Sequence, residues 1–251
     1  MDIGVLIIGS ELTTGKRCDA HLGQAIKVLA RRGLELSWCS IVADRPARIV
    51  RALRRSMSDG DLVFSFGGLG FTPDDHTRHC AAEAVGVPIA RHPEAVAAIE
   101  AQFGQEADPV RVRMAELPYG CELIPNPVNG GPGFSLGDHH FLPGFRSMAW
   151  PMMEWVLDRQ YAHMFNTEPP VEYLVQTHDA REGDVVDLME RFVERHPHVH
   201  LASLPHRTEH AWDIEFGVRG PEHEVRRGLD WLTAELDRRG LRWEARPHEL
   251  T

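Results

Sequence analysis

The stretch DLVFSFGGLGFTPDDHT, residues 61–77, decides the fold because it joins an apolar run to a glycine turn and two acids. The run from residue 61 to residue 68 predicts a central strand of a sheet. The glycines then fall at the carboxyl end of that strand. In open α/β sheets, ligands bind in the crevice outside the carboxyl ends of the strands. The stretch therefore predicts a strand and a ligand-binding loop together.

Alternating strands and helices precede this stretch and set the class of fold. We expect strands over residues 3–9 and 34–42, and helices over residues 20–33 and 46–57. The first strand is a continuous apolar run, typical of a parallel sheet that is buried on both faces. In the first helix Leu22, Ile26 and Leu29 share one face, and Gly33 ends the helix. Strand, helix, strand, helix, strand implies right-handed crossovers and a doubly wound α/β domain with a mostly parallel sheet.

The chain after the stretch continues this domain and then changes its pattern. We expect helices over residues 78–86, 93–104, 108–118 and 146–165, a strand over 139–144, and short strands and turns over 119–137. Pro151 is tolerated in the last of these helices if it lies in the first turn. Beyond residue 166 the segment TEPPVE has the composition of a linker. We therefore expect a first domain over residues 1–165 and a second domain over residues 166–251.

The second domain follows the order strand, helix, strand, strand, helix, strand. The expected elements cover residues 171–178, 183–196, 200–206, 211–220, 221–240 and 241–246. The βαββαβ order is that of the ferredoxin-like arrangement. We expect a small α+β domain that mediates self-association rather than nucleic-acid binding.

Within residues 66–77, the glycine turn and the acids suggest two different roles, phosphate binding and metal binding. Glycines 67, 68 and 70 allow backbone N–H groups to point together at an anion, and the helix that opens near Thr77 adds its positive end. Two carboxylates would repel a phosphate unless a divalent cation lay between them, so Asp74 and Asp75 are candidate metal ligands and catalytic residues. The alternative is that one of them caps the following helix.

Two further glycine turns follow predicted strands and could share one pocket with the first. In GSELTTG, residues 9–15, Ser10 could reach a phosphate, and Glu11 could join the metal site or bind a polar ring. Alternatively, Ser10 or Thr13 caps a helix and Glu11 is its first-turn acid. The turn LPGF, residues 142–145, is the third.

Composition excludes several classes of protein. A net charge of −10 argues against nucleic acid as the main partner, because phosphate backbones are bound by clustered Lys and Arg. The apolar start is too short for a membrane span and lacks the features of a signal peptide, so we expect a cytoplasmic protein. Four cysteines lie far apart without zinc-like spacing, and the fifteen histidines include no helical metal pair.

Five separated motifs then carry a resemblance to a known family. They are GSELTTGK (9–16), FGGLGFTPDDHT (66–77), RMAELP (113–118), IPNPVNGGPGFSL (124–136) and FLPGF (141–145). In this order they resemble the molybdopterin-binding domain superfamily and, within it, the amino-terminal domain of the competence/damage-inducible protein A (CinA-like) family, whose middle motif usually reads TGGLGPTxDDxT. The resemblance covers residues 1 to about 160, and the βαββαβ segment resembles the small domain that follows. We expect no counterpart of that family's terminal nicotinamide-nucleotide deamidase domain.

The resemblance implies a molybdopterin-binding-like three-layer α/β domain that binds a phosphorylated pterin or nucleotide. Some relatives cleave pyrophosphate bonds of ADP-ribose or FAD-like dinucleotides with a divalent metal, helped by potassium. Carried over by motif, the site contains Gly67, Gly68, Leu69, Gly70, Thr72, Asp74, Asp75 and Thr77, with Gly9, Ser10 and Glu11 opposite and Pro143 and Gly144 on a third side. The sequence departs from the family at Phe66, Phe71, His76 and Arg146; the Phe71 ring either packs on the core or stacks on a ligand ring.

Two functions remain open from the sequence. The first is a pyrophosphatase that uses Mg²⁺, Mn²⁺ or Co²⁺ to hydrolyse ADP-ribose or a related dinucleotide. The second is a molybdopterin- or nucleotide-binding or sensor module without catalysis, because no Cys–His or Ser–His pair is evident in the sequence. In either case we expect a homodimer or another homo-oligomer, the usual form of soluble assemblies.

Overall fold

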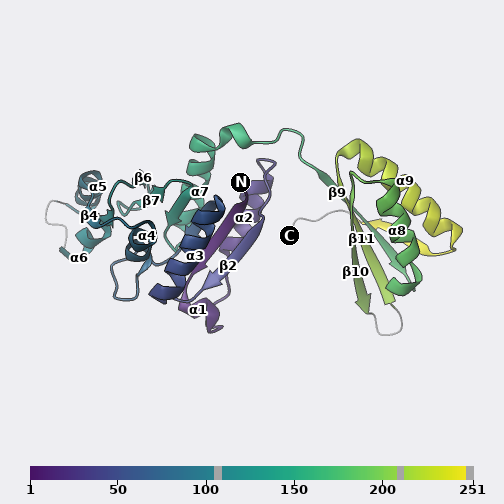
Figure 1. The fold of residues 1–251 in the computed structure, drawn as a ribbon, viewed down its shortest axis with the longest axis horizontal. Helices are drawn as coiled ribbons and strands as arrows, with labels where there is room; N and C mark the ends of the chain where they lie inside the picture. Colours follow the sequence, from purple (N-terminus) through teal and green to yellow (C-terminus); the bar gives the residue numbers. More distant parts are fainter. Residues whose placement is uncertain (105–108, 208–211, 247–251) are drawn as a thin grey trace. The chain divides into compact units, whose positions relative to one another are not determined.

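The computed structural model describes residues 1–104, 109–207 and 212–246 of the chain (Figure 1). It contains two compact units, Met1–Phe165 and a second that begins at Asn166, beside the TEPPVE segment. Two expected elements begin outside the described residues, the helix from Asp108 and the strand from Ala211. In the described chain, no helix combines the length and the apolar composition that crossing a membrane requires.

A six-stranded sheet forms the centre of the first unit, in the order β2-β1-β3-β8-β7-β6. Its strands are β1 (Ile3–Ile8), β2 (Trp38–Val42), β3 (Leu62–Phe66), β6 (Glu122–Ile124), β7 (Gly133–Leu136) and β8 (His139–Leu142). The neighbours β2, β1, β3 and β8 are parallel, whereas β7 and β6 pair antiparallel. The prediction of a mostly parallel sheet is confirmed, with antiparallel strands at one edge.

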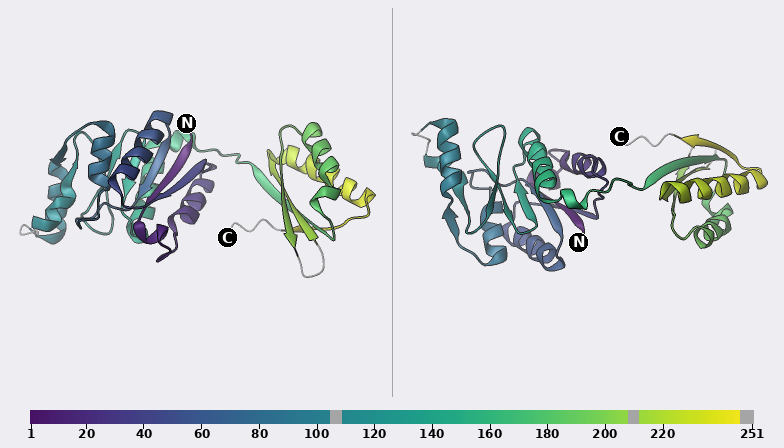
Figure 2. Two further views of the ribbon diagram at one scale, coloured as in Figure 1. Left: turned by 60° about the horizontal axis from the view of Figure 1, so that its bottom comes forward. Right: turned by 90° about the horizontal axis from the view of Figure 1, so that it is seen from above.

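Helices cover both faces of this sheet, which makes three layers (Figure 2). The helices of this unit are α1 (Ser10–Thr13), α2 (His21–Ala30), α3 (Pro46–Asp59), α4 (Thr77–Val85), α5 (Pro93–Phe103), α6 (Pro109–Val112) and α7 (Arg146–Gln160). The strands β4 (Ile89–Arg91) and β5 (Glu116–Pro118) form a separate two-stranded antiparallel sheet. Alternate residues of β1 face opposite layers: Val5 and Ile7 pack with α2 and α7, whereas Leu6 and Ile8 pack with α3 and α4. This alternation buries all of β1, as expected for a central parallel strand.

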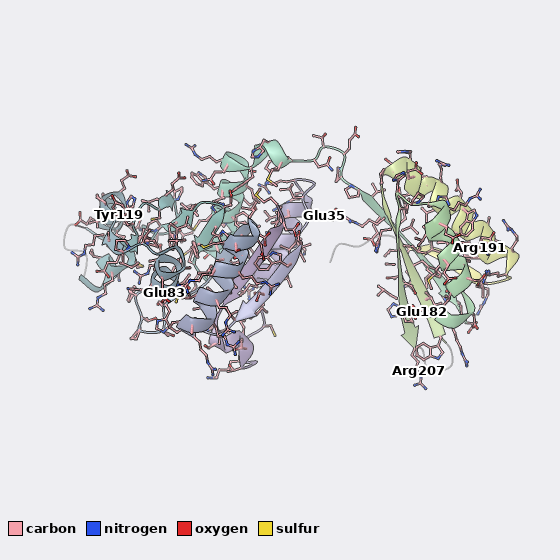
Figure 3. All side chains as sticks on the ribbon, in the orientation of Figure 1. Glu35, Glu83, Tyr119, Glu182, Arg191 and Arg207 are labelled. Carbon is pink, nitrogen blue, oxygen red and sulfur yellow. The ribbon has the colours of Figure 1, made fainter. Side chains whose placement is uncertain are left out.

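The helix α4, which follows the glycine turn, is held against α3. The Arg54 guanidinium donates to the Glu83 carbonyl over 3.1 Å and lies 3.8 Å from its carboxylate. Figure 3 labels Glu83 on α4. Gly86 ends the helix with a φ of 75°, in the left-handed region that glycine adopts easily. The carboxyl-terminal half of α4 is therefore anchored by an element outside the glycine turn.

Several boundaries differ from those expected from the sequence. The helical segment expected to reach Pro118 ends at Ala115, because Glu116–Pro118 pair with β4 as the strand β5, and the helix expected to reach Phe165 ends at Gln160. The strand β2 begins at Trp38 rather than Leu34, because the Leu34 N–H donates to the Leu29 carbonyl in the cap of α2. Pro151 lies in the second turn of α7, not the first, so it cannot donate to the carbonyl of Ser147. Ser147 is exposed, and water can satisfy its carbonyl.

The second unit has the expected ferredoxin-like arrangement. Its elements are β9 (Val171–His178), α8 (Val186–Arg195), β10 (His200–Arg207), β11 (Trp212–Gly220), α9 (Glu222–Arg238) and β12 (Arg242–Arg246). The antiparallel sheet has the order β10-β11-β9-β12, and one of its faces packs against both helices. Arg191 of α8, labelled in Figure 3, pairs with the buried Glu235 of α9 at 3.0 Å.

Candidate phosphate and metal site

Two glycine turns lie in contact at the carboxyl edge of the parallel sheet. The first is the glycine loop, residues 67–71, which follows β3, and the second is the PG loop, residues 143–145, which follows the adjacent strand β8. The Gly67 N–H donates to the Leu142 carbonyl over 3.0 Å. A Cβ on Gly144 would lie only 3.5 Å from the Gly67 Cα. The two loops therefore share one surface of the unit.

The first loop, residues 9–15, lies at the same edge, beyond β1. A Cβ on Gly67 would lie 2.2 Å from the Ile8 carbonyl oxygen, so only glycine fits there without movement of the backbone. The Ser10 hydroxyl accepts the Asp44 N–H over 3.0 Å, and the Asp44 carboxylate accepts the Ser10 N–H over 2.6 Å. This reciprocal pair fixes the first loop to the segment after β2. Glu11 is exposed, and its carboxylate lies near Gly9.

The glycine loop turns its carbonyl groups toward the start of α4. The Thr77 hydroxyl donates to the Gly67 carbonyl over 2.9 Å, and the Thr77 N–H donates to the Gly68 carbonyl over 3.1 Å. The Arg78 guanidinium donates to the Gly70 carbonyl over 2.6 Å. Because a trans peptide holds C=O and N–H on opposite sides, the N–H groups that follow these carbonyls point away from α4.

Three N–H groups of the loop are thereby presented together, those of Gly68, Leu69 and Phe71. Among the described residues, none of them has a hydrogen-bond acceptor. Gly67 and Gly68 have φ of 102° and 67°, which side chains other than glycine rarely adopt. Such an arrangement suits an anion with several oxygens, such as a phosphate.

Two carboxylates follow directly in the acid turn, residues 72–76. The Thr72 hydroxyl lies 2.6 Å from Asp74 Oδ1 and 2.5 Å from Asp75 Oδ2, and the Thr72 N–H donates to Asp75 Oδ2 over 2.9 Å. The Thr72 hydroxyl, then the Asp74 backbone, lowers the pKa of the Asp74 carboxyl, so this exposed group is anionic at neutral pH. Among the described residues, Asp74 Oδ2 and Asp75 Oδ1 receive no hydrogen bond from another residue.

These two oxygens suit a cation that is coordinated partly by the protein and partly by a bound ligand. They do not suit a cation that is coordinated by the protein alone. The described residues contain no group of three or more His, Cys, Asp or Glu side chains around a common point. Mg²⁺ binds through one or two carboxylates together with substrate phosphate oxygens. Asp74 and Asp75 can supply the protein share of such a site next to the N–H groups of the glycine loop.

Two residues predicted as ligands have inward-facing side chains instead. Thr77 is fully buried, and its hydroxyl is used by the Gly67 carbonyl. The Leu69 side chain packs in the apolar core with Ile8 and Ile49. Tertiary packing decided both orientations. Thr77 therefore shapes the loop, and Leu69 can reach a ligand only through its backbone.

His21, at the start of α2, was not predicted as a site residue, yet it supports the PG loop. Its Nε2 lies 3.0 Å from the Gly144 carbonyl, and its ring stacks on Phe66 with centroids 4.5 Å apart. Burial lowers the pKa of the His21 imidazole, so it is neutral at pH 7. Nε2 then carries the proton that it donates to Gly144.

Asp44 and Arg78 were missed as well, for different reasons. Asp44 lies just beyond a predicted strand, so the strand-end rule that selected the glycine turns could have found it. Arg78 lies one residue past the quoted motif, and only the tertiary structure shows that it contacts the loop.

The glycine loop and the PG loop each carry one aromatic ring that does not join the apolar core. Phe71 is 40% exposed and Phe145 is 69% exposed. Neither ring stacks on another ring of the described chain. The Phe71 side chain is therefore accessible, and core packing does not account for it.

Two hollows lie elsewhere in the first unit. A hollow of about 660 Å³ is lined at the amino end of β8 by residues that include Asp138 and His139, and another of about 770 Å³ lies between β2 and α3. Neither is lined by a residue of the three loops. The hydrogen-bond donors of the glycine loop mark the loop surface as a site.

The fold and the glycine loop define a molybdopterin-binding-like α/β protein, and the chain belongs to that family. A family model described as a probable molybdopterin binding domain matches residues 4–163. The CinA-like protein of Syntrophotalea carbinolica is 31% identical over 224 residues, covering 86% of this chain and 52% of that protein. The CinA-like protein of Desulfotalea psychrophila is 36% identical over 167 residues, covering 63% of this chain and 40% of that protein.

A solved structure from Thermoplasma acidophilum, described as the protein CinA with unknown function, has the same fold as the first unit. It matches with a TM-score of 0.58 and 28% identity, over 63% of this chain and 98% of that one. The resemblance to CinA-like proteins is thus confirmed. The chain spans about half or less of the length of the two curated relatives named above.

Proposed function

We propose that this protein binds a phosphorylated pterin or nucleotide and is a metal-dependent pyrophosphatase that acts on ADP-ribose or a related dinucleotide. The observation that carries the proposal is the set of three unbonded N–H groups on the glycine loop beside Asp74 Oδ2 and Asp75 Oδ1, which receive no hydrogen bond from another described residue. The family membership supports a pterin- or nucleotide-sized ligand.

The chain's own residues would bind and orient the diphosphate. The N–H groups of Gly68, Leu69 and Phe71 would hold non-bridging oxygens and stabilise the negative charge that develops as the P–O–P bond breaks. Asp74 and Asp75 would hold a divalent cation, which supplies charge neutralisation of the phosphates when it is bound. Water would add to one phosphorus and the bridging oxygen would leave with the other phosphate. The two protons of the water pass to the two monophosphate products or to solvent. His21 would hold the adjacent PG loop in place through its hydrogen bond to the Gly144 carbonyl.

The accessible rings of Phe71 and Phe145 complete this proposal. A planar heterocycle such as adenine or pterin stacks readily on an aromatic ring. Glu11 is exposed in the first loop and would bind a polar edge of the same ring.

Turnover of ADP-ribose with Mg²⁺, Mn²⁺ or Co²⁺, with and without potassium, tests the proposal. The variants Asp74→Asn and Asp75→Asn are expected to lower turnover by at least 100-fold, because they remove charge from the metal ligands while they keep an oxygen that accepts from Thr72. Asp59→Asn, an exposed acid at the end of α3, is the matched control and is expected to stay within twofold. Unchanged turnover in both acid variants would contradict the proposal.

A ligand-binding module without turnover is the second candidate. The observation that favours it is the small number of metal ligands, since the described residues offer two carboxylates and no third group of that kind nearby. A thermal shift with a molybdopterin precursor, together with no hydrolysis of any dinucleotide, would favour this candidate. For either candidate we propose a homo-oligomer, which light scattering tests directly.

A further inference from the structure

Arg78 is a buried cation directly behind the glycine loop. The residue is 4% exposed. Its Nη2 donates to the Gly70 carbonyl over 2.6 Å, and its Nη1 donates to the Glu116 carbonyl over 3.1 Å and to the Arg113 carbonyl. Its Nε has no hydrogen-bond partner. The guanidinium therefore joins the loop to the segment that precedes and begins β5.

The acceptors around Arg78 are carbonyl groups, which carry only partial charges. Within the described ranges, no carboxylate oxygen lies within ion-pair distance of its guanidinium. The carboxylate of Glu116 lies instead 3.7 Å from the exposed Arg91. Asp75 and Glu116 act on Arg78 only through space, and burial lowers the pKa of the guanidinium without removing its charge at neutral pH. A buried charge of this kind is costly unless an opposite charge approaches it.

The bond from Arg78 also sets the orientation of one peptide group. It holds the Gly70 carbonyl on the side of α4, so the Phe71 N–H points to the opposite side of the loop. This is one of the three N–H groups to which the proposed function assigns the phosphate. The same side chain thus orients a donor and places a positive charge behind it.

We propose that Arg78 is a positioning residue that makes the glycine loop an anion receptor before any metal binds. It would turn the Phe71 N–H toward a phosphate oxygen and supply the charge that this oxygen balances. The inference rests on the proposed role of the glycine loop, but it does not require hydrolysis or a cation. The anion it predicts is any compact phosphate or diphosphate group.

Binding of inorganic pyrophosphate in the presence of a chelator tests this proposal on the full chain. We expect calorimetry to show metal-free binding by the wild-type protein. Arg78→Met is expected to weaken binding at least tenfold, because it removes both the charge and the bond to Gly70. Arg78→Lys keeps the charge and is expected to restore part of the affinity. Arg91→Met, which removes an exposed arginine near the same Glu116, is the matched control and is expected to stay within twofold.

A second measurement needs no substitution and remains decisive if Arg78→Met does not fold. In the wild-type protein, the NMR signals of the Arg78 Nε–H and of the Phe71 N–H are expected to shift during a pyrophosphate titration, with the same affinity as the calorimetry. An Nε–H signal that does not move would overturn the proposal. So would Arg78→Met binding as tightly as wild type.

The failure of this inference can be told apart from failure of the proposed function. If the wild-type protein binds pyrophosphate only with Mn²⁺, Arg78 does not make the loop an anion receptor, while metal-dependent hydrolysis stands. If metal-free binding occurs at the loop but no dinucleotide is hydrolysed, the inference stands and the pyrophosphatase does not.

Discussion

Replacing Gly67 by alanine should destabilise the first unit much more than a comparable change at another glycine. Gly67 has a φ of 102°, which costs alanine about 1–3 kcal/mol. Its Cβ would lie 2.2 Å from the Ile8 carbonyl oxygen, whereas contacts below 3.0 Å essentially never occur. The Ile8 carbonyl, on a central strand, would have to move until this distance reaches at least 3.0 Å. Such a shift resembles overpacking of a core, which costs about 1–3 kcal/mol. We expect a loss of between about 2 and 6 kcal/mol.

The matched control is Gly86→Ala at the end of α4. Gly86 has a φ of 75°, but nothing lies within 4 Å of the position that its Cβ would take. Its loss is expected to be only about 1–2 kcal/mol, from the left-handed backbone alone. The difference between the two variants isolates the contact with Ile8.

Native-state hydrogen exchange of the β1 and β3 amides is the suitable assay. It reports the free energy of opening of the first unit separately from the second unit, so two-state unfolding of the whole chain need not be assumed. Losses in Gly67→Ala and Gly86→Ala that agree within about 0.5 kcal/mol would refute the reasoning, since the close approach would then carry no cost.

Three further predictions follow from buried or exposed side chains of the first unit. Thr77→Val should lower the free energy of unfolding by about 1–3 kcal/mol, because the buried Gly67 carbonyl loses its hydroxyl donor, while Thr77→Ser should retain most of it in urea titrations. Burial lowers the pKa of His139 to about 4 and that of His140 to about 3. The unfolded chain therefore binds more protons, and the free energy of unfolding should fall as the pH decreases from about 6.5 toward 4. His139→Gln should flatten the slope of the urea midpoint against pH, and a slope identical to wild type would contradict the assignment. Alanine at Phe71 or Phe145 should raise the Kd for ADP-ribose about three- to tenfold and leave that for pyrophosphate unchanged, as measured by calorimetry; equal losses for both ligands would exclude ring stacking.

Local pattern was sufficient for most elements of the fold. The strand β3 is fully buried, as its apolar run indicates, and Gly33 ends α2 in a left-handed conformation. The errors arose where neighbours in space decided the outcome. Leu34 is held by the cap of α2, so β2 begins later, and α7 continues through Pro151 because its Met152 and Met153 are buried in the core.

The sequence predicted where the candidate site lies in the fold, but not which side chains contact which groups there. The strand-end rule found the glycine loop and its neighbours, because it depends only on the order of parallel strands. Side-chain roles required the tertiary structure. Nothing local shows that Thr77 points inward, that His21 bonds to a carbonyl 123 residues away, or that Arg78 contacts the Gly70 carbonyl.

A crystal structure of the protein with ADP-ribose and Mn²⁺ tests the phosphate and metal assignment most directly. We expect diphosphate oxygens within about 2.7–3.2 Å of the backbone nitrogens of Gly68, Leu69 and Phe71. We also expect the metal to be bound by Asp74 and Asp75 together with the same diphosphate. A diphosphate bound away from the glycine loop, or a metal bound without either aspartate, would contradict the assignment.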